Sequence, residues 1–231
     1  MNIDDALRRS SAHILIESGH ALADDLVLDS DTEHHLARVL RLSSGEDVTV
    51  TDGAGRWRSY RSTVTGSAVS LSAASDIHGV ARREPLLEIA TAIPKGDRVE
   101  WLVQKATEIG VDRICLLHAE RSVVRWKADR STKQLVRLQK IADEALRQCR
   151  RTWRVEVVGP IDASSVLAEF AVAEPGGRPL STIDRRLAIG PEGGWSDGEL
   201  AVAAARVQLT PHVLRTETAV VAAATLAVHL A

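Results

Sequence analysis

The sequence predicts an α/β protein in two parts: a small β-rich domain over residues 1–78 and a larger domain with a parallel sheet over residues 79–231. Short, half-polar strand patterns separated by turn signals fill the first part. From Leu86 onwards, continuous apolar runs typical of strands buried on both faces alternate with amphipathic helices. Hydrophobic residues make up 45% of the 231-residue chain, which is enough for the cores that this division needs.

Five strands and one helix are expected in the first domain, at a spacing that favours a small barrel. The strand candidates are residues 13–16, 25–28, 47–52, 56–63 and 68–74. The helix is expected after Ser30, because Glu33 stands at capping-box distance from it. Leu36, Val39 and Leu40 recur at helical spacing and are expected to form its buried face.

The second domain is expected to alternate strands with helices. Strands are predicted at residues 86–93, 111–118, 155–158 and 186–190. Helices are predicted to begin at Asp97, at the Ser131–Gln134 pair, at the Ser196–Glu199 capping box and at residue 216, and the last of them to run to residue 231. The stretch Pro175–Pro179 is interpreted as a loop because of its glycines and prolines.

Positive charge is concentrated in one segment. The net charge is −2, yet residues 121–154 contain eleven Lys or Arg against three acids, a local excess of +8. Such a segment is either a phosphate-binding face or a solvated helix, and charge alone leaves both open.

Cys115 and Cys149 stand far apart and are expected to be buried thiols in a reducing cytoplasm. Long apolar runs, a secretory signal and metal-ligand spacings do not occur, so we expect no membrane span and no metal.

Two segments carry the residues expected to bind a ligand. The turn Gly190–Gly194 follows a buried strand, and ligands of open α/β sheets sit outside the carboxyl ends of strands. Its glycines let a backbone approach a ligand closely, although a structural turn explains them equally well. The segment Leu209–Ala219 leads through a proline turn into a helix, with Thr216 or Thr218 as its expected cap. Arg215 is unfavourable at the positive end of a helix dipole, so either a salt bridge or an anionic ligand is needed to account for it.

Several segments together resemble a known family. They are, in chain order, Lys95–Trp101, Gln104–Val111, Glu120–Ser122, Ile189–Gly194 and Val213–Ala219. In sequence and in order they are similar to the signatures of the bacterial methyltransferases that modify N3 of a uridine in 16S ribosomal RNA. Val39–Arg41 resembles the N-terminal barrel of the same family.

The resemblance implies an RNA-binding, PUA-like β-barrel followed by a SPOUT-type α/β methyltransferase domain with a deep trefoil knot. It also implies S-adenosylmethionine (SAM) as the cofactor, held among three loops of the knot. The cofactor-binding residues that it implies are Glu174, Pro175, Ile189, Gly190, Pro191, Gly193, Gly194, Leu209, Val213, Leu214 and Thr218. Such enzymes work as homodimers, and a stripe of small residues on the last helix would let two helices approach closely: Ala219, Ala222, Ala223 and Ala227.

Methyl transfer to uridine N3 requires loss of the N3 proton, which leaves a negative charge spread over the base. A nearby cation would stabilise that charge, and Arg215 is the expected catalytic residue. Glu192 is the second candidate catalytic residue, as a base or as a residue that orders its loop. Ordering is favoured, because a carboxylate is a poor base for so weak an acid unless its pKa is strongly raised. The expected partner is 16S ribosomal RNA or the small ribosomal subunit, contacted by Arg38, Arg41, Lys95, Lys105, Arg121, Arg147, Arg150 and Arg151.

Thr210 and His212 depart from the family's pattern, which has glycine and a basic residue at these positions. A side chain at Thr210 is expected to alter cofactor affinity without loss of the fold. These departures keep two alternatives open. One is a SPOUT enzyme that acts on another position of ribosomal or transfer RNA, such as a ribose 2′-hydroxyl. The other is an RNA-binding assembly factor that no longer turns over.

Overall fold

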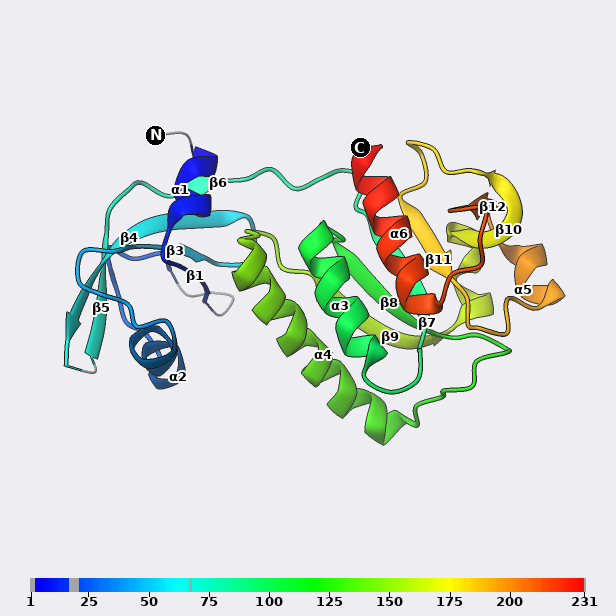
Figure 1. The fold of residues 1–231 in the computed structure, drawn as a ribbon, viewed down its shortest axis with the longest axis horizontal. Coiled ribbons are helices and arrows are strands. Elements are labelled where there is room, and N and C mark those ends of the chain that lie inside the picture. Colours follow the sequence, from blue (N-terminus) through cyan, green and yellow to red (C-terminus); the bar gives the residue numbers. More distant parts are fainter. Residues whose placement is uncertain (1–2, 17–20, 67, 231) are drawn as a thin grey trace. The chain divides into compact units, whose positions relative to one another are not determined.

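The protein is described from a computed structural model that covers residues 3–16, 21–66 and 68–230, arranged in two compact units (Figure 1). Unit 1 comprises residues 1–82 and 146–154, and unit 2 comprises residues 83–145 and 155–231. The division therefore does not simply follow the chain. The end of the basic segment, residues 146–154, belongs to the N-terminal unit, whereas the sequence places it wholly in the second domain.

Unit 1 is built on one sheet, and the five strands expected there are confirmed. Its strands are β1 (Ala12–Leu15), β2 (Asp25–Leu26), β3 (Asp47–Thr51), β4 (Arg56–Thr65), β5 (Ala68–Ala73) and β6 (His78–Gly79). They pair in the order β1-β3-β4-β5-β2, with β6 alongside β4. Alternate side chains, among them Ile14, Val48 and Tyr60, face a common core. A short helix that the sequence does not predict, α1 (Ile3–Arg9), precedes β1.

The helix expected after Ser30 differs in its cap and in its buried face. The cap of α2 (Ser30–His34) is Asp29, whose side chain accepts a backbone N–H at 2.8 Å, so the capping box at Ser30 is wrong. The helix then widens into a π-helix, His35–Val39. Because a π-helix has more residues per turn, positions chosen for the α-helical period drift away from the core. Val39 and Leu40 are accordingly 62% and 45% exposed, against the expectation of burial.

A buried histidine connects the strands of unit 1 with the segment 146–154. The His13 ring lies 2.8 Å from Thr49 Oγ1 and 3.0 Å from the carbonyl oxygen of Arg151. Burial lowers the pKa of His13 from its ordinary 6.5 to about 4, so the ring is neutral at physiological pH. Nε2 therefore donates to the carbonyl and Nδ1 accepts from the threonine hydroxyl.

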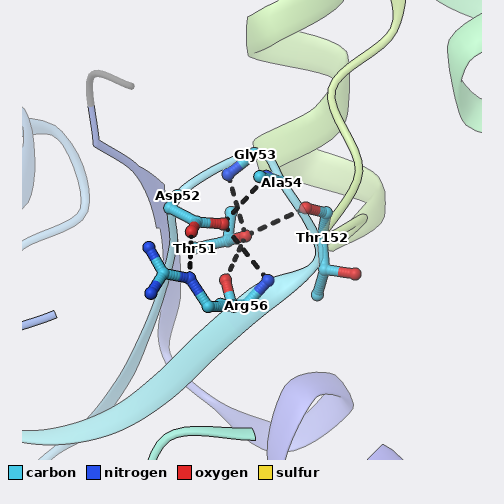
Figure 2. Close-up of polar contacts among 6 residues, drawn as sticks. All are labelled: Thr51, Asp52, Gly53, Ala54, Arg56 and Thr152. Carbon is cyan, nitrogen blue, oxygen red and sulfur yellow. Dashed lines mark hydrogen bonds and ion pairs between the residues drawn. The ribbon is translucent and has the colours of Figure 1, made fainter. Parts of the chain in front are cut away.

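The turn between β3 and β4 lies against the same segment (Figure 2). The Thr51 hydroxyl lies 2.9 Å from the Arg56 carbonyl oxygen and 3.1 Å from that of Thr152. The Asp52 carboxylate accepts the Ala54 N–H at 2.8 Å and the Arg56 Nε at 2.7 Å. These contacts satisfy the polar groups of a tight turn and attach residue 152 to it.

Unit 2 has a parallel sheet, as the sequence predicts. Its strands are β7 (Glu88–Ala92), β8 (Arg113–His118), β9 (Glu156–Asp162), β10 (Ala171–Pro179), β11 (Arg186–Ile189) and β12 (Ala205–Gln208), in the order β12-β10-β11-β7-β8-β9. All neighbouring strands in this order pair in parallel. Within β7, Ile89 and Ala90 are both fully buried but belong to different cores, which confirms a strand buried on both faces.

Helices cover both faces of this sheet (Figure 1). One face carries α3 (Arg98–Ile109), α4 (Ala128–Cys149) and α6 (Thr216–His229). The other carries α5 (Asp197–Val202) and the 3₁₀ turns Ala163–Ser165 and Leu167–Glu169. The architecture thereby confirms the predicted α/β class. The last helix ends at His229, with Leu230 as its C-cap, so it stops before the expected end at residue 231, which lies outside the described residues.

The helix starts of unit 2 agree only in part with the predictions. The Ser196–Glu199 capping box is confirmed. Asp97 stands at the N-cap of α3, but its side chain makes no capping hydrogen bond. α4 begins at Ala128, so the cap predicted at Ser131 is wrong, and the Ser131 hydroxyl instead donates to the Lys127 carbonyl within the helix at 2.9 Å.

Two further expectations are overturned by packing. Residues 175–179 belong to β10 and are not a loop, because the pairing of β10 with β12 resumes at Arg178 after a register shift from Ala173. Ala219, Ala223 and Ala227 of the small-residue stripe are buried in this chain's own core. They are therefore used inside the subunit and do not offer a surface to a second one.

Candidate active site

A cavity of about 240 Å³ lies beyond the carboxyl ends of β11 and β12, beside the bulged middle of β10. Ligands of open α/β sheets bind at this edge. Most of the residues expected to bind the cofactor line it: Glu174, Pro175, Ile189, Gly190, Pro191, Gly194, Leu209, Val213 and Leu214. Gly193 and Thr218 are exposed and do not line it. Sequence reasoning missed five residues of the wall: Ala173, Trp195, Gln208, Thr216 and Ala219.

Trp195 and Thr216 fix the first part of the Gly-rich turn. The Trp195 ring packs so closely on Gly190 that a Cβ there would lie 3.0 Å from the ring. Its Nε1 donates to the Ala173 carbonyl at 3.3 Å, which connects the turn to β10. The Thr216 hydroxyl donates to the Gly190 carbonyl at 3.1 Å, and so it does not cap α6 as expected. Glycine is needed at Gly190 because of this close approach.

The second wall of the cavity is the loop after β12, which is tied to itself. The Thr210 hydroxyl donates to the His212 carbonyl at 2.8 Å and lies 3.2 Å from the His212 N–H, which it can accept. Gln208 Nε2 donates to the Thr210 carbonyl at 3.0 Å. The Thr210 hydroxyl thus forms its hydrogen bonds within the loop. The apolar residues Leu209, Val213 and Leu214 of the same loop line the cavity.

Charged side chains surround the mouth of the cavity. Glu192 lines it and is 44% exposed, with Arg98 Nη1 at 3.9 Å. Arg98 Nε lies 3.7 Å from Glu217, so this arginine stands between two carboxylates. Arg215 is the N-cap residue of α6 and is exposed, between the wall residues Leu214 and Thr216. Within the described part of the chain, the Arg215 guanidinium forms no hydrogen bond or ion pair.

A histidine, His118, lies at the carboxyl end of β8, on the same edge of the sheet as the cavity. Its Nε2 accepts the Trp126 N–H at 3.1 Å. Burial, with a smaller contribution from the nearby Arg125 charge, lowers the pKa of His118 below its ordinary value. The ring is therefore neutral, and its acceptor nitrogen is used to hold the following loop.

The residues expected to bind RNA fall into two groups. Arg38, Arg41, Lys95 and Arg147 are exposed. Arg41 has a φ of 54°, which is uncommon for a residue with a side chain. The remaining four have contacts within the fold: Lys105, Arg121, Arg150 and Arg151.

Arg150 is bound into unit 1. Its guanidinium donates to the carbonyl oxygens of Leu7 at 2.8 Å and Ser10 at 2.7 Å, and also to the Ser10 hydroxyl. Arg151 contributes its carbonyl oxygen to His13. Arg150 is consequently better explained as a structural residue than as an RNA contact.

Two family models match this chain. One, described as an RNA methyltransferase domain, matches residues 82–228, and another, an RNA methyltransferase PUA domain, matches residues 28–63. The chain belongs to the RNA methyltransferase domain family. Unit 2 supplies nearly all of the matched catalytic domain, and the expected combination of a PUA-like and a SPOUT-type domain is confirmed.

Two curated relatives of this RNA methyltransferase carry the name ribosomal RNA small subunit methyltransferase E. The protein from Synechocystis is 32% identical over 212 residues, covering 80% of this chain and 67% of that protein. The protein from Mycobacterium tuberculosis is 28% identical, covering 84% of this chain and 82% of that protein.

Solved structures with the same fold include two that contain the cofactor. A methyltransferase from Legionella pneumophila in complex with SAM is 29% identical with a TM-score of 0.78, covering 92% of this chain and 95% of that chain. The small-subunit methyltransferase E of Neisseria gonorrhoeae, bound to SAM, is 26% identical with a TM-score of 0.77, covering 93% of this chain and 95% of that chain.

Among the described residues, no helix is both long and apolar enough to cross a membrane, and no three His, Cys, Asp or Glu side chains gather as a metal would require.

Proposed function

We propose that this RNA methyltransferase uses SAM to methylate N3 of a uridine in 16S ribosomal RNA, and that it acts as a homodimer in the cytoplasm. The observation that carries the proposal is the cavity between the Gly190–Gly194 turn and the Leu209–Leu214 loop, next to Arg215, which has no side-chain partner among the described residues. The relatives' shared name supports the small-subunit RNA as substrate, and the two SAM-bound structures support the cofactor.

The residues of the cavity fit SAM. Ile189, Leu209 and Leu214 offer apolar surface for an adenine ring. Glu174 and Glu192 line the same space, and their negative charges would attract a sulfonium or ammonium group. The cavity volume of about 240 Å³ is somewhat below the roughly 300–1,000 Å³ found for ligand sites, and the cavity is open to solvent at its mouth.

When bound, SAM supplies a methyl group that its sulfonium already makes electrophilic. The residues of this chain then have two tasks. The walls hold donor and base in line, which can supply several kcal/mol of the barrier. The second task is to stabilise the negative charge that remains on the base after the N3 proton is lost. Arg215 is the candidate for this task, because it is exposed between two wall residues and its guanidinium is unpaired within the described residues.

Glu192 orders its turn in this proposal and does not act as the base. Its carboxylate is half-exposed and pairs with Arg98 of α3 at 3.9 Å, which ties the turn to that helix. The target base must be unpaired or extruded before its N3 edge can reach the cavity. Exposed Arg38, Arg41, Lys95 and Arg147 would neutralise backbone phosphates of the bound RNA.

Mapping modified nucleotides in ribosomal RNA tests the function directly. A strain that lacks the gene should lose one N3-methyluridine from its 16S RNA, and the wild-type gene should restore it. Loss of a ribose 2′-O-methyl group instead would show that the enzyme methylates a ribose hydroxyl. A purified protein that binds RNA but not SAM would be an RNA-binding assembly factor without methyltransferase activity. Sedimentation at micromolar concentration should give about twice the 25.0 kDa chain mass, and an active monomer would refute the dimer.

A further inference from the structure

We infer that Arg121 is a positioning residue of the cofactor cavity, which holds the Gly-rich turn in its binding shape from outside. The inference deepens the proposed function and rests on it for the identity of the cofactor. Arg121 is exposed and belongs to the basic segment, so its sequence context points to an RNA contact. Its hydrogen bonds point to a different role.

Arg121 reaches from the loop after β8 to the Gly-rich turn. Its Nη1 donates to the carbonyl oxygens of Gly193 at 3.3 Å and Trp195 at 3.0 Å. These carbonyls flank Gly194, which lines the cavity. Gly194 has a φ of 70°, and its N–H donates to the Pro191 carbonyl at 2.9 Å to close the turn. One guanidinium therefore holds the outer side of a turn whose inner side faces the cavity.

A second tie joins the same two loops. Glu199 is only 4% exposed, and one of its carboxylate oxygens accepts the Glu120 N–H at 2.8 Å. The other accepts the Ser196 N–H at 2.9 Å. The two loops also approach closely at Gly193, where a Cβ would lie 3.3 Å from the Arg121 Cβ. The distance between the loops is thus fixed on both sides of Trp195.

The turn needs such a brace because of its composition. Gly193 and Gly194 are glycines, the residue type that has the most backbone freedom and loses the most entropy when it is ordered. If the turn became ordered only when the ligand binds, this entropy loss would weaken the affinity. A guanidinium suits the task, because it offers several donors in a fixed plane. Among the described residues Arg121 has no carboxylate partner, and its only hydrogen bonds are to the turn.

The test combines amide hydrogen exchange with SAM titration. In ligand-free Arg121→Ala, exchange across residues 190–196 should become faster. The Kd for SAM and for S-adenosylhomocysteine should rise about tenfold, because part of the binding energy must then order the turn. The melting temperature should stay nearly unchanged, since the side chain is exposed. Arg121→Lys should recover part of the affinity, because an ammonium also carries several donors on one nitrogen but lacks the fixed plane that orients them.

Arg125→Ala is the matched control. It removes the same charge from the same loop, but its guanidinium donates to the Ala119 carbonyl and not to the Gly-rich turn. It should leave both the exchange of residues 190–196 and the Kd for SAM as in the wild type. Unchanged exchange and SAM affinity in Arg121→Ala would overturn the inference, and a loss of RNA affinity alone would assign Arg121 to the RNA surface. Failure of the wild-type protein to bind SAM would refute the proposed function instead.

Discussion

Arg150 and Arg215 are both candidate functional residues from the sequence, yet the structure uses them in opposite ways. Arg150 directs its guanidinium into unit 1, onto backbone carbonyls and the Ser10 hydroxyl. Arg215 is exposed at the start of α6, between Leu214 and Thr216, which line the cavity. A guanidinium whose donors are already satisfied inside the fold contributes to stability. One that the described residues leave unsatisfied is available to a substrate.

The same contrast separates the two ends of the basic segment. Arg121 and Arg150 stand near its ends, and both donate to backbone carbonyls, but they do so in different units. The +8 excess therefore does not describe one continuous RNA-binding face. It combines residues that brace loops with exposed residues such as Arg147. Mutations test this contrast: loss of Arg215 should affect turnover and not stability, and loss of Arg150 should affect stability and not turnover.

The largest expected effect is on turnover in Arg215→Ala. If Arg215 stabilises the charge on the base, kcat should fall roughly a hundred- to a thousandfold, the range found when one donor to a developing anion is removed. The Kd for SAM and the melting temperature should hardly change, because the side chain is exposed. Single-turnover methylation of small ribosomal subunits measures the first quantity, and titration and thermal unfolding measure the others.

Two further variants sharpen the assignment of Arg215. Arg215→Lys should recover only part of kcat, because a point charge cannot bridge two oxygens as a planar fork can. Arg206→Ala, in the strand before the same loop, also removes an exposed arginine and should leave kcat unchanged. Near-normal turnover in a stable Arg215→Ala protein would exclude a catalytic role.

Arg150→Met should show the reverse pattern. Removing a charged donor from buried carbonyls costs about 2–3 kcal/mol of unfolding free energy, because the acceptors are left without partners. Arg147→Met, three residues earlier and exposed, should change it by less than about 0.5 kcal/mol. Denaturant unfolding measures both. A stable Arg150→Met protein with weakened RNA binding would return Arg150 to the RNA surface.

The buried His13 predicts a pH dependence of stability. Its pKa is about 4 in the folded protein, against 6.5 for an exposed histidine. As pH falls through this window the unfolded chain takes up the proton and the folded chain does not, so stability is lost with falling pH. Between pH 6.5 and 5 the loss should be on the order of 2 kcal/mol.

The informative measurement is the difference between the wild type and His13→Gln. Gln can keep a donor near the Arg151 carbonyl but does not titrate. Burial also lowers the pKa of His118, which contributes in the same direction in both proteins and cancels in the difference. Parallel curves of unfolding free energy against pH for the two proteins would show that His13 does not control this window.

The sequence predicts well those strands that carry a local pattern of their own, whereas β6, β10 and β12 are not among the predicted strands. The apolar run from Leu86 and the Ser196–Glu199 box are of this kind, and both are confirmed. Contacts between distant segments have no such pattern. Trp195 against Gly190, Thr216 on the Gly190 carbonyl and Arg150 on Ser10 depend on the tertiary fold. A glycine next to a tryptophan in one turn could have indicated the first of them.

The smallest expected effect concerns Thr210, in the other wall of the cavity. Thr210→Ala removes the hydroxyl that bonds His212 twice, so the loop must be ordered by the ligand. The Kd for SAM should rise about two- to fivefold, which corresponds to roughly 0.5–1 kcal/mol. Thr210→Ser keeps the hydroxyl and should bind as the wild type does, whereas Thr210→Gly adds backbone freedom and should bind no better than Thr210→Ala. If the side chain instead crowds the cofactor, both Ala and Gly would tighten binding, and isothermal titration of the three variants separates the two outcomes.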